Sequence, residues 1–318
     1  MKSIFWRTTL IGLISSFSMI NVQAAAPFAK TQAPAYYRMM LGEFEITALS
    51  DGTVELPVDK LLTNTTPNHV EKILSRSYLK LPLETSVNSY LINTGSKLIL
   101  VDTGAGNLFG PTLGKLVNNL RAAGYQPDQI DEIYITHIHP DHIGGLADGE
   151  KAAFPNAIVR VDQEDADFWL SKENLEHAAP DQKAFFQGAM SSLAPYIKTG
   201  KLKPFSGETE LTPGIKTRKA HGHTKGHTLY EIEDQKQKLV LWGDIVHVGA
   251  LQFSEPTIAI QFDTDQKLAV ADRQKAFFDA DKNGYWVAAA HLSFPGIGHV
   301  RSEKKGYTWI PANYSAGK

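Results

Sequence analysis

The segment THIHPDHIGG, residues 136–145, places three histidines and an aspartate within six consecutive positions. His137, His139, Asp141 and His142 offer imidazole nitrogens and a carboxylate, which are ligands that zinc and similar cations prefer. Such close spacing indicates a loop at the end of a strand, where short side chains can point into one cleft. Three protein ligands and a water define a catalytic zinc site, and four ligands this close together could serve two metal ions.

Most of the other histidines also lie in short clusters farther along the chain. The candidates in these clusters are His221, His223, His227, Asp244, His247, His291 and His299. Only His69 and His177 lie apart, and we interpret both as ordinary surface or helix histidines. The chain contains no cysteine, so any zinc must be held by histidines and carboxylates.

Hydrophobic patterning predicts the elements that must position these side chains. Three apolar stretches are typical of strands that end at a candidate ligand: IDEIYITH at His137, KLVLWGD at Asp244 and YWVAAAH at His291. Helices are predicted in GPTLGKLVNNLRAAGYQ and in DQKLAVADRQKAFFDADKNG. A strand-rich first half, followed by helices between later strands, predicts an α/β fold with two sheets face to face and helices outside.

Two hairpins are predicted near the start of the regular structure. EFEITALSDGTVEL alternates apolar and polar residues around Asp51-Gly52, a strong hairpin signal, so we expect two antiparallel strands there. VNSYLINTGSKLILV predicts a second hairpin that turns at Thr94-Gly95. Regular structure is expected to begin near Phe44, after an N-terminal arm over residues 25–43, and to form a single domain over residues 44–318.

Composition and charge limit the class of protein. With 318 residues, 42% of them hydrophobic and 21% charged, the chain can bury a sizeable core. The formal net charge is -2, and no long block of Lys or Arg occurs after the N-terminus, so nucleic acid is not an expected partner.

The first 24 residues have the pattern of a secretory signal peptide. Lys2 and Arg7 precede a short apolar run, and small residues follow around a predicted cleavage site after Ala24. An uncleaved anchor is the alternative, but the run is short and interrupted by serines, so stable membrane insertion is not expected. The pattern predicts a periplasmic or secreted protein.

The chain carries HIHPDH, then a downstream GHT, then WGD and finally a strand-end histidine. With this pattern the chain resembles the metallo-β-lactamase superfamily of hydrolases over roughly residues 44–300. The resemblance implies an αββα sandwich of two mixed β-sheets with outer helices. It also implies two divalent metal ions, zinc foremost, although the ligand types suit Mn, Fe and Co as well. Asp244 would bridge the two ions. The implied ligands are His137, His139 and His223 for one ion and Asp141, His142 and His291 for the other.

Longer blocks, among them ETSVNSYLINTG, GHTKGHT and HLSFPGIGHV, are similar to the methyl parathion hydrolase branch. This similarity implies Phe109, Trp169 and Phe186 as aromatic walls of an apolar substrate pocket, although each could equally be a core residue. Quorum-quenching lactonases of the superfamily usually carry tyrosine three residues after the bridging aspartate, where this chain has His247. That histidine could donate a hydrogen bond or orient Asp244.

A water shared by two divalent cations loses its proton near neutral pH, and the resulting hydroxide is the expected nucleophile. Asp244 or Asp141 could accept or shuttle the proton, and Asp102 is expected to hydrogen-bond a ligand histidine. The expected function is hydrolysis of lactones or other esters, acyl-homoserine lactones included, with promiscuous phosphotriester hydrolysis.

Several alternatives to this function remain. They are an organophosphate hydrolase, a β-lactamase, which the presence of Asp244 disfavours, and a non-catalytic metal-dependent binding protein. The resemblance and the apolar segment APAYYRMMLGEF also suggest a homodimer.

Overall fold

The computed structural model describes residues 26, 28–180 and 182–315. The chain divides into two units, residues 1–33 and 34–318, and every helix and strand named below belongs to the second unit. The predicted signal peptide lies outside the described residues and stays a prediction. In the part of the chain that the structure describes, no helix is long and apolar enough to cross a membrane.

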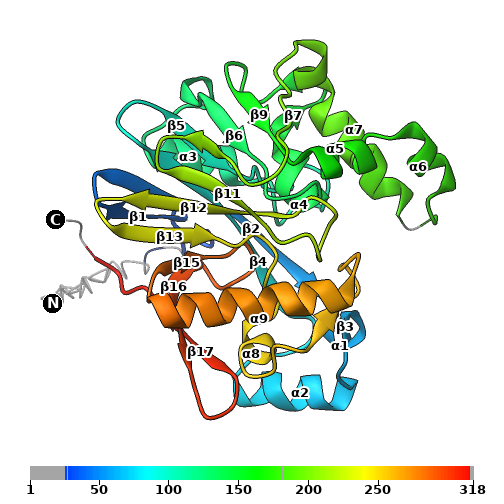
Figure 1. The fold of residues 1–318 in the computed structure, drawn as a ribbon, viewed down its shortest axis with the longest axis vertical. Coiled ribbons are helices and arrows are strands. Elements are labelled where there is room, and N and C mark those ends of the chain that lie inside the picture. Colours follow the sequence, from blue (N-terminus) through cyan, green and yellow to red (C-terminus); the bar gives the residue numbers. More distant parts are fainter. Residues whose placement is uncertain (1–25, 27, 181, 316–318) are drawn as a thin grey trace, which may run out of the picture. The chain divides into compact units, whose positions relative to one another are not determined.

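The first sheet is mixed and has six strands (Figure 1). In spatial order they are β1 (Tyr36–Leu41), β2 (Phe44–Leu56), β4 (Leu83–Asn93), β5 (Leu98–Val101), β6 (Glu132–Tyr134) and β9 (Ile158–Arg160). The pairs from β1 to β5 are antiparallel, whereas β5–β6 and β6–β9 are parallel. Parallel strands bring their carboxyl ends to one edge of the sheet.

The second sheet has seven strands and a single parallel pair, β13–β15. Its order is β10 (Glu210–Thr212), β11 (Ile215–Lys219), β12 (Thr228–Asp234), β13 (Gln237–Leu241), β15 (Trp286–Ala288), β16 (Ile297–Ser302) and β17 (Tyr307–Pro311). Two short pairs complete the strands, β3 (Leu62–Thr63) with β14 (Ala259–Ile260) and β7 (Ala147–Asp148) with β8 (Lys151–Ala152).

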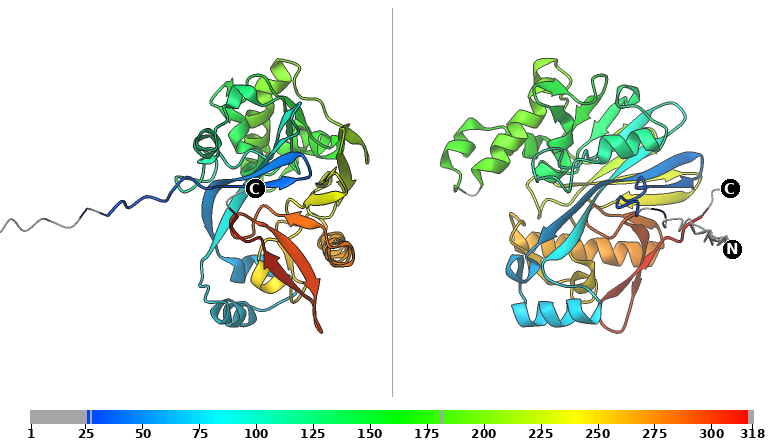
Figure 2. Two further views of the ribbon diagram at one scale, coloured as in Figure 1. Left: turned by 90° about the vertical axis from the view of Figure 1, so that its left-hand side faces the viewer. Right: turned by 180° about the vertical axis from the view of Figure 1, so that it is seen from behind.

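The helices lie mainly outside the two sheets (Figure 2). They are α1 (Val58–Leu61), α2 (Pro67–Arg76), α3 (Leu116–Ala122), α4 (Pro140–Ile143), α5 (Gln163–Trp169), α6 (Lys172–His177), α7 (Lys183–Lys198), α8 (Gly249–Gln252) and α9 (Gln266–Asn283). Residues of α3, α5 and α7 cover the first sheet, and residues of α9 cover the second.

Strand periodicity explains this layering, because successive side chains point to opposite faces of a strand. In β5, Ile99 and Val101 pack between the sheets, whereas Leu98 and Leu100 face the helices. Across the middle layer, Tyr134 of β6 stacks on a tyrosine of β12 with ring centroids 5.4 Å apart. The layers therefore run helix, sheet, sheet, helix, and the predicted αββα sandwich is confirmed.

The predicted hairpin at Asp51-Gly52 is wrong. β2 runs through this pair as one strand with a bulge, and it pairs with β4 both before and after the bulge. The buried Asp51 carboxylate accepts hydrogen bonds from the backbone nitrogens of Ala105, Gly114 and Leu116, at 2.9 to 3.0 Å. An Asp-Gly pair suits a bulge as well as a turn, since glycine permits the positive φ of 124° found here. Asp51 thus anchors the loop over residues 102–115.

Regular structure begins earlier than predicted. β1 pairs with β2 from Tyr36↔Leu49 to Leu41↔Phe44, so most of the expected arm after residue 35 is an edge strand. Gly42, with φ of 61°, makes the two-residue turn between them. The second predicted hairpin is confirmed by the antiparallel pair β4–β5.

Candidate metal centre

The clustered histidines and aspartates lie where several strands of both sheets end. His137 follows β6, and His139 precedes α4, which Pro140 begins, so that Asp141 and His142 lie in its first turn. The loop between β11 and β12 carries His223, Asp244 follows β13, and His291 follows β15. The carboxyl ends of parallel strands are where α/β folds place their ligands, which explains this convergence.

Gly144 and Gly145, just after the histidine segment, let two loops touch. A Cβ atom at either glycine would lie 2.0 Å from a carbonyl oxygen, that of Ala105 or that of Thr103. Any side chain here would push the loop over residues 102–115 away from the segment that carries the histidines.

Three imidazoles meet in the first group. The Nε2 atoms of His137 and His223 lie 3.0 and 3.1 Å from Nδ1 of His139, and Asp244 Oδ2 lies 3.3 Å from His223 Nε2. All four residues are buried. Ring nitrogens so close together cannot all carry protons, so the arrangement suits lone pairs directed at one cation.

A second group lies beside the first and shares Asp244. Asp141 Oδ2 lies 3.5 Å from His142 Nε2 and 3.4 Å from His291 Nε2. Asp244 Oδ1 lies 3.2 Å from His142 Nε2, and its Oδ2 lies 3.1 Å from His291 Nε2. One carboxylate therefore faces both groups.

Unpaired polar atoms show that these residues fit metal ions. His142 Nε2 and Asp244 Oδ1 are buried and have no hydrogen-bond partner among the described residues. Leaving such atoms unpaired in a protein interior is costly, and a divalent cation would remove that cost. The donor set of imidazole nitrogens and carboxylate oxygens suits zinc and its first-row neighbours.

Burial and the carboxylates set the protonation of the site. Burial holds the pKa of His137 and His139 well below the usual histidine value, so both rings are neutral and can bind a metal. Burial also lowers the pKa of His223, but hydrogen bonds to Asp244 and Asp263 outweigh it and raise that pKa to about 9. Burial alone would raise the pKa of Asp244. The neighbouring histidines, of which His291 has the largest effect, instead hold that pKa well below its usual value.

A sequence model of the metallo-beta-lactamase superfamily matches residues 83–295, which span the two groups. The chain belongs to the metallo-β-lactamase superfamily. N-acyl homoserine lactonase AiiA of Bacillus thuringiensis subsp. kurstaki is 25% identical over 219 residues, which cover 63% of this chain and 79% of that protein.

Two solved structures align over most of the chain. Hydrolase AbOPH is 38% identical with a TM-score of 0.85, and the match covers 90% of this chain and 100% of that one. AidC, a dizinc quorum-quenching lactonase in complex with a product, is 27% identical with a TM-score of 0.78, covering 88% of this chain and 98% of that one. Together with the site, these relatives identify the chain as a metal-dependent hydrolase.

As in other metal centres, a second set of groups orients the histidine rings of this metallo-β-lactamase fold. Asp102 Oδ2 lies 2.8 Å from Nδ1 of His142, as expected from the sequence. Asp263 Oδ1 lies 2.8 Å from Nδ1 of His223, and the Ser86 carbonyl oxygen lies 3.0 Å from Nδ1 of His291. Each contact leaves Nε2 free to face the site.

The contact of Asp263 with a candidate ligand histidine was not predicted, because FDTDQK has the pattern of an ordinary helix start. Asp265 does cap α9, accepting hydrogen bonds from the backbone nitrogens of Lys267 and Leu268. Asp263, two residues earlier, is instead buried beside His223. Nothing in the local sequence separates these two roles.

Asp165 is a second residue that the sequence did not reveal. Its buried carboxylate accepts hydrogen bonds from the backbone nitrogens of Ile138 and Gly226 and from the Thr224 hydroxyl, at 2.7 to 2.9 Å. It thereby ties the loop of His137 and His139 to the loop of His223. Burial raises its pKa to about 6.

The remaining histidines divide into structural and site-facing residues. His227 donates from Nδ1 to the Ala220 carbonyl and accepts at Nε2 from the Asp244 backbone nitrogen, so it supports the loop of Asp244. His299 packs against Trp286, with ring centroids 3.9 Å apart. His69 lies near the surface beside a glutamate, and His177 is exposed at the end of α6.

His247 faces the metal site. Its Nε2 lies 3.0 Å from Asp244 Oδ2, and its ring stacks on that of His291 at 5.2 Å and 19°. Nδ1 is buried and has no hydrogen-bond partner within the described ranges. Both roles suggested by the sequence, orienting Asp244 and donating to a ligand, are compatible with this position.

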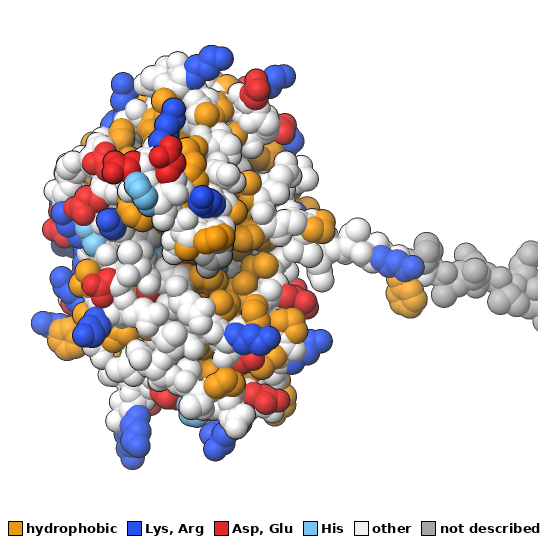
Figure 3. All heavy atoms as spheres, turned by 90° about the vertical axis from the view of Figure 1, so that its right-hand side faces the viewer, with side chains coloured by type: hydrophobic (Ala, Val, Ile, Leu, Met, Phe, Trp, Pro, Cys, Tyr) orange, Lys and Arg blue, Asp and Glu red, His pale blue; other side chains and the backbone are white. Residues whose placement is uncertain are grey.

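A small aromatic cavity of about 130 Å³ opens beside the two groups. Phe109, Phe185 and Phe262 form its aromatic walls, and Asp141 and Asp244 are among the residues that face it. Figure 3 shows hydrophobic side chains gathered in a band on the face of the molecule at the right of Figure 1. Hereafter the cavity of about 130 Å³ is called the aromatic cavity.

Of the three predicted aromatic walls, only Phe109 lines this cavity. Phe186 is only 2% exposed and belongs to the core between α7 and the first sheet, so its prediction is wrong. Consecutive residues of a helix point about 100° apart, which turns Phe185 to the cavity and Phe186 inward. Trp169 is also a core residue, with its ring edge against His139 at 5.4 Å and Phe185 stacked on it.

Proposed function

We propose that this protein hydrolyses lactone or other carboxylic ester bonds of small molecules, acyl-homoserine lactones among them, with two divalent cations. One observation carries the proposal: the Asp244 carboxylate lies between two buried groups of metal-binding side chains at the floor of an apolar cavity. The similarity to lactonases AiiA and AidC supports this choice of substrate.

The proposed ligands are those implied by the sequence. His137, His139 and His223 would hold one cation, and Asp141, His142 and His291 the other, with Asp244 between them. Bound there, the cations would lower the pKa of a water molecule and polarise the carbonyl oxygen of the ester. Zinc is the proposed metal because the donor set suits it and because the relative AidC is a dizinc enzyme.

Two carboxylates of the chain could handle the proton of the attacking water. The neighbouring histidines, His142 foremost, hold the pKa of Asp141 below its usual value despite burial, and Asp244 is likewise ionised. Both side chains line the aromatic cavity, so each can accept a proton from a water placed beside the ester. His247, at the same wall, can hold Asp244 in position or donate a hydrogen bond to the substrate.

Phosphotriester hydrolysis is the second candidate. Three phenylalanines surround the aromatic cavity, and a flat aryl leaving group would pack well between such rings. The chemistry of the cations is the same, because both reactions attack an electrophilic centre and displace an oxygen. The resemblance to the methyl parathion hydrolase branch supports this candidate but stays a prediction.

Residues 25–318, depleted of metal and then reloaded with zinc, manganese or cobalt, provide the test. Hydrolysis of an acyl-homoserine lactone, an aryl ester and a nitrophenyl phosphotriester would be compared by kcat/KM. The proposal expects the lactone to exceed the phosphotriester by more than about tenfold, or 1.4 kcal/mol in transition-state binding. A faster phosphotriester reaction would overturn the order of the two candidates.

Export to the periplasm or medium and a homodimeric state are also proposed, from the sequence of residues 1–24 and of residues 33–44 respectively. N-terminal sequencing of the mature protein after cell fractionation tests the first. Light scattering on the purified protein tests the second.

A further inference from the structure

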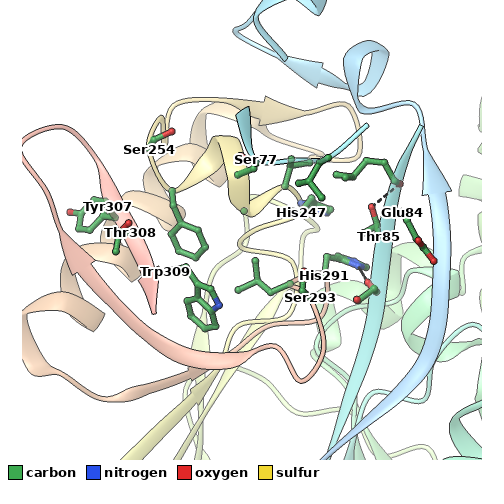
Figure 4. A pocket seen from close by; sticks show the side chains of 18 residues that line it. Ser77, Glu84, Thr85, His247, Ser254, His291, Ser293, Tyr307, Thr308 and Trp309 are labelled. Atoms are coloured by element: carbon green, nitrogen blue, oxygen red, sulfur yellow. Dashed lines mark hydrogen bonds between the residues drawn. The ribbon is translucent and has the colours of Figure 1, made fainter. Parts of the chain in front are cut away.

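A second and larger cavity adjoins the metal centre. It has a volume of about 410 Å³ and shares His247 and His291 with the aromatic cavity. Figure 4 shows these two histidines in its centre, with Thr85 of β4 on one side and Trp309 of β17 on the other. Hereafter it is called the α8 cavity, because residues 249 and 250 of α8 also line it.

The walls of the α8 cavity suit a neutral and partly apolar ligand. Leu79, Leu83, Phe253 and Trp309 provide apolar surface, and hydroxyl groups such as those of Ser254 and Ser293 lie between them. No lysine or arginine is among the described residues that line it. Its one carboxylate, that of Glu84, accepts a hydrogen bond from the Thr53 hydroxyl at 2.9 Å. An anion would therefore find no lysine or arginine among the described residues of this wall.

The sizes of the two cavities indicate how they divide the substrate. Sites for drug-sized ligands usually measure about 300 to 1,000 Å³. The aromatic cavity, at about 130 Å³, is too small for more than a ring or a short group. The α8 cavity, at about 410 Å³, lies within the usual range and touches the same two histidines.

We propose that the α8 cavity binds the neutral acyl chain of the substrate while the aromatic cavity holds the group at the scissile bond. This inference rests on the proposed ester or lactone hydrolysis and names the part of the substrate that gives it specificity. His247 lines both cavities and so lies at their boundary.

A surface groove of about 390 Å³ is the rival location for the chain. Leu108, Phe109 and Phe185 line it, and both Leu108 and Phe109 are substantially exposed. None of the proposed metal ligands is among the described residues of this groove, whereas His291 lines the α8 cavity. We therefore favour the α8 cavity, and the groove becomes an outcome of the test.

Matched substitutions separate the two locations. Ala250→Phe fills the α8 cavity from α8, and Ala184→Phe fills the surface groove from α7. Leu79→Trp is a second filling variant at a position that is 41% exposed, where folding tolerates a larger side chain. Each protein would be loaded with zinc and assayed with acetyl- and decanoyl-homoserine lactone.

The proposal expects Ala250→Phe and Leu79→Trp to lower kcat/KM for the decanoyl substrate by roughly tenfold or more, while the acetyl substrate changes by less than about twofold. Ala184→Phe should change neither. A decanoyl-selective loss in Ala184→Phe alone would place the chain in the surface groove and overturn the proposal. Unchanged ratios in all three variants would also overturn it.

Failure of the proposed function would look different, because the wild-type protein would then hydrolyse neither lactone. In that case, binding of a non-hydrolysable decanoyl amide would be followed by quenching of tryptophan fluorescence, since Trp309 lies in the wall. Saturable quenching that Ala250→Phe weakens and Ala184→Phe does not would still support the chain site. No quenching, or equal quenching in both variants, would reject it.

Discussion

The metal centre and the substrate cavities are neighbours, but they are built differently. Around the metal centre, Asp102, Asp263 and a backbone carbonyl each hold one histidine ring by its Nδ1 atom at 2.8 to 3.0 Å. The aromatic cavity has no such attachments among its described phenylalanines, and Phe109 is 40% exposed. Hydrogen bonds fix direction, whereas apolar contact fixes only proximity.

This difference suggests how one metal centre could accept several substrates. Positions of the ligand atoms must be set within a few tenths of an ångström, so each ring needs its own anchor. Walls made of phenylalanine and leucine can change with a single substitution and leave those anchors intact. We therefore expect substitutions at the centre to change the rate for every substrate, and substitutions at the cavities to change the ranking of substrates.

The strongest test of the comparison is Asp244→Ala, since Asp244 faces both groups. Its loss would remove the proposed shared ligand and proposed proton acceptor, so kcat/KM should fall on the order of a thousandfold for lactone, ester and phosphotriester alike. Steady-state kinetics, metal analysis and circular dichroism would be recorded together. Loss for only one substrate, with metal content unchanged, would contradict a shared centre.

Phe185 and Phe186 provide a matched pair for the cavity. Phe186→Ala should lower the free energy of unfolding by about 3 to 5 kcal/mol, because it leaves a hole in the core. Phe185→Ala should cost much less stability and should alter the relative kcat/KM of aryl and alkyl substrates. Denaturant unfolding and kinetics on both variants decide this. Equal stability losses would mean that Phe185 is also a core residue.

Removing an anchor should have an intermediate effect. In Asp263→Ala, His223 loses the carboxylate at its Nδ1 atom, and zinc affinity should fall by roughly 10- to 100-fold. Competition with a chromogenic chelator measures it. The control is Asp148→Ala, an exposed aspartate in the β7 strand, which should leave the affinity unchanged. An affinity equal to that of the control would show that the ring needs no anchor.

The last expected effect is a pH dependence of stability from Asp165. Burial raises its pKa from a usual 3.8 to about 6, so the folded protein binds this proton more tightly than the unfolded chain. The contribution to stability is present at low pH and is lost as the pH rises through about 6. Asp165→Asn lacks this titration, so the free energy of unfolding of wild type should fall relative to that of the variant between pH 4 and 7, by roughly 3 kcal/mol.

Denaturant unfolding of metal-free wild type and Asp165→Asn across this pH range provides the measurement. Metal-free protein is needed, because metal binding has its own pH dependence. A free energy of unfolding of wild type that rises relative to that of the variant with rising pH would show that Asp165 is ionised more easily in the folded protein than in the unfolded chain.

The strand ends and the metal-binding segment could be predicted from the sequence because their signals are local. His137, His139, Asp141 and His142 lie within six residues, and alternating apolar residues identify the strands that lead to such loops. The four-layer sandwich followed from the same patterning together with the family resemblance. Each of these signals is contained within a short stretch of chain.

The errors in prediction arose where one local pattern suits two structures. Asp51-Gly52 has the composition of a hairpin turn, yet β4 runs beside β2 along its whole length and turns the pair into a bulge. Phe185 and Phe186 are chemically identical neighbours, and only the rotation of α7 decides which one meets the cavity. Neither choice is encoded within a few residues.

The sequence by itself determined which side chains could bind metal and which strands would carry them. Only the tertiary structure decided what holds those side chains, because Asp263 lies 40 residues from His223 and Asp165 lies 27 residues from Ile138. It also decided that two cavities meet at His247. Hydrogen bonds and cavities depend on distances in space, and chain folding sets these by packing elements that are remote in sequence.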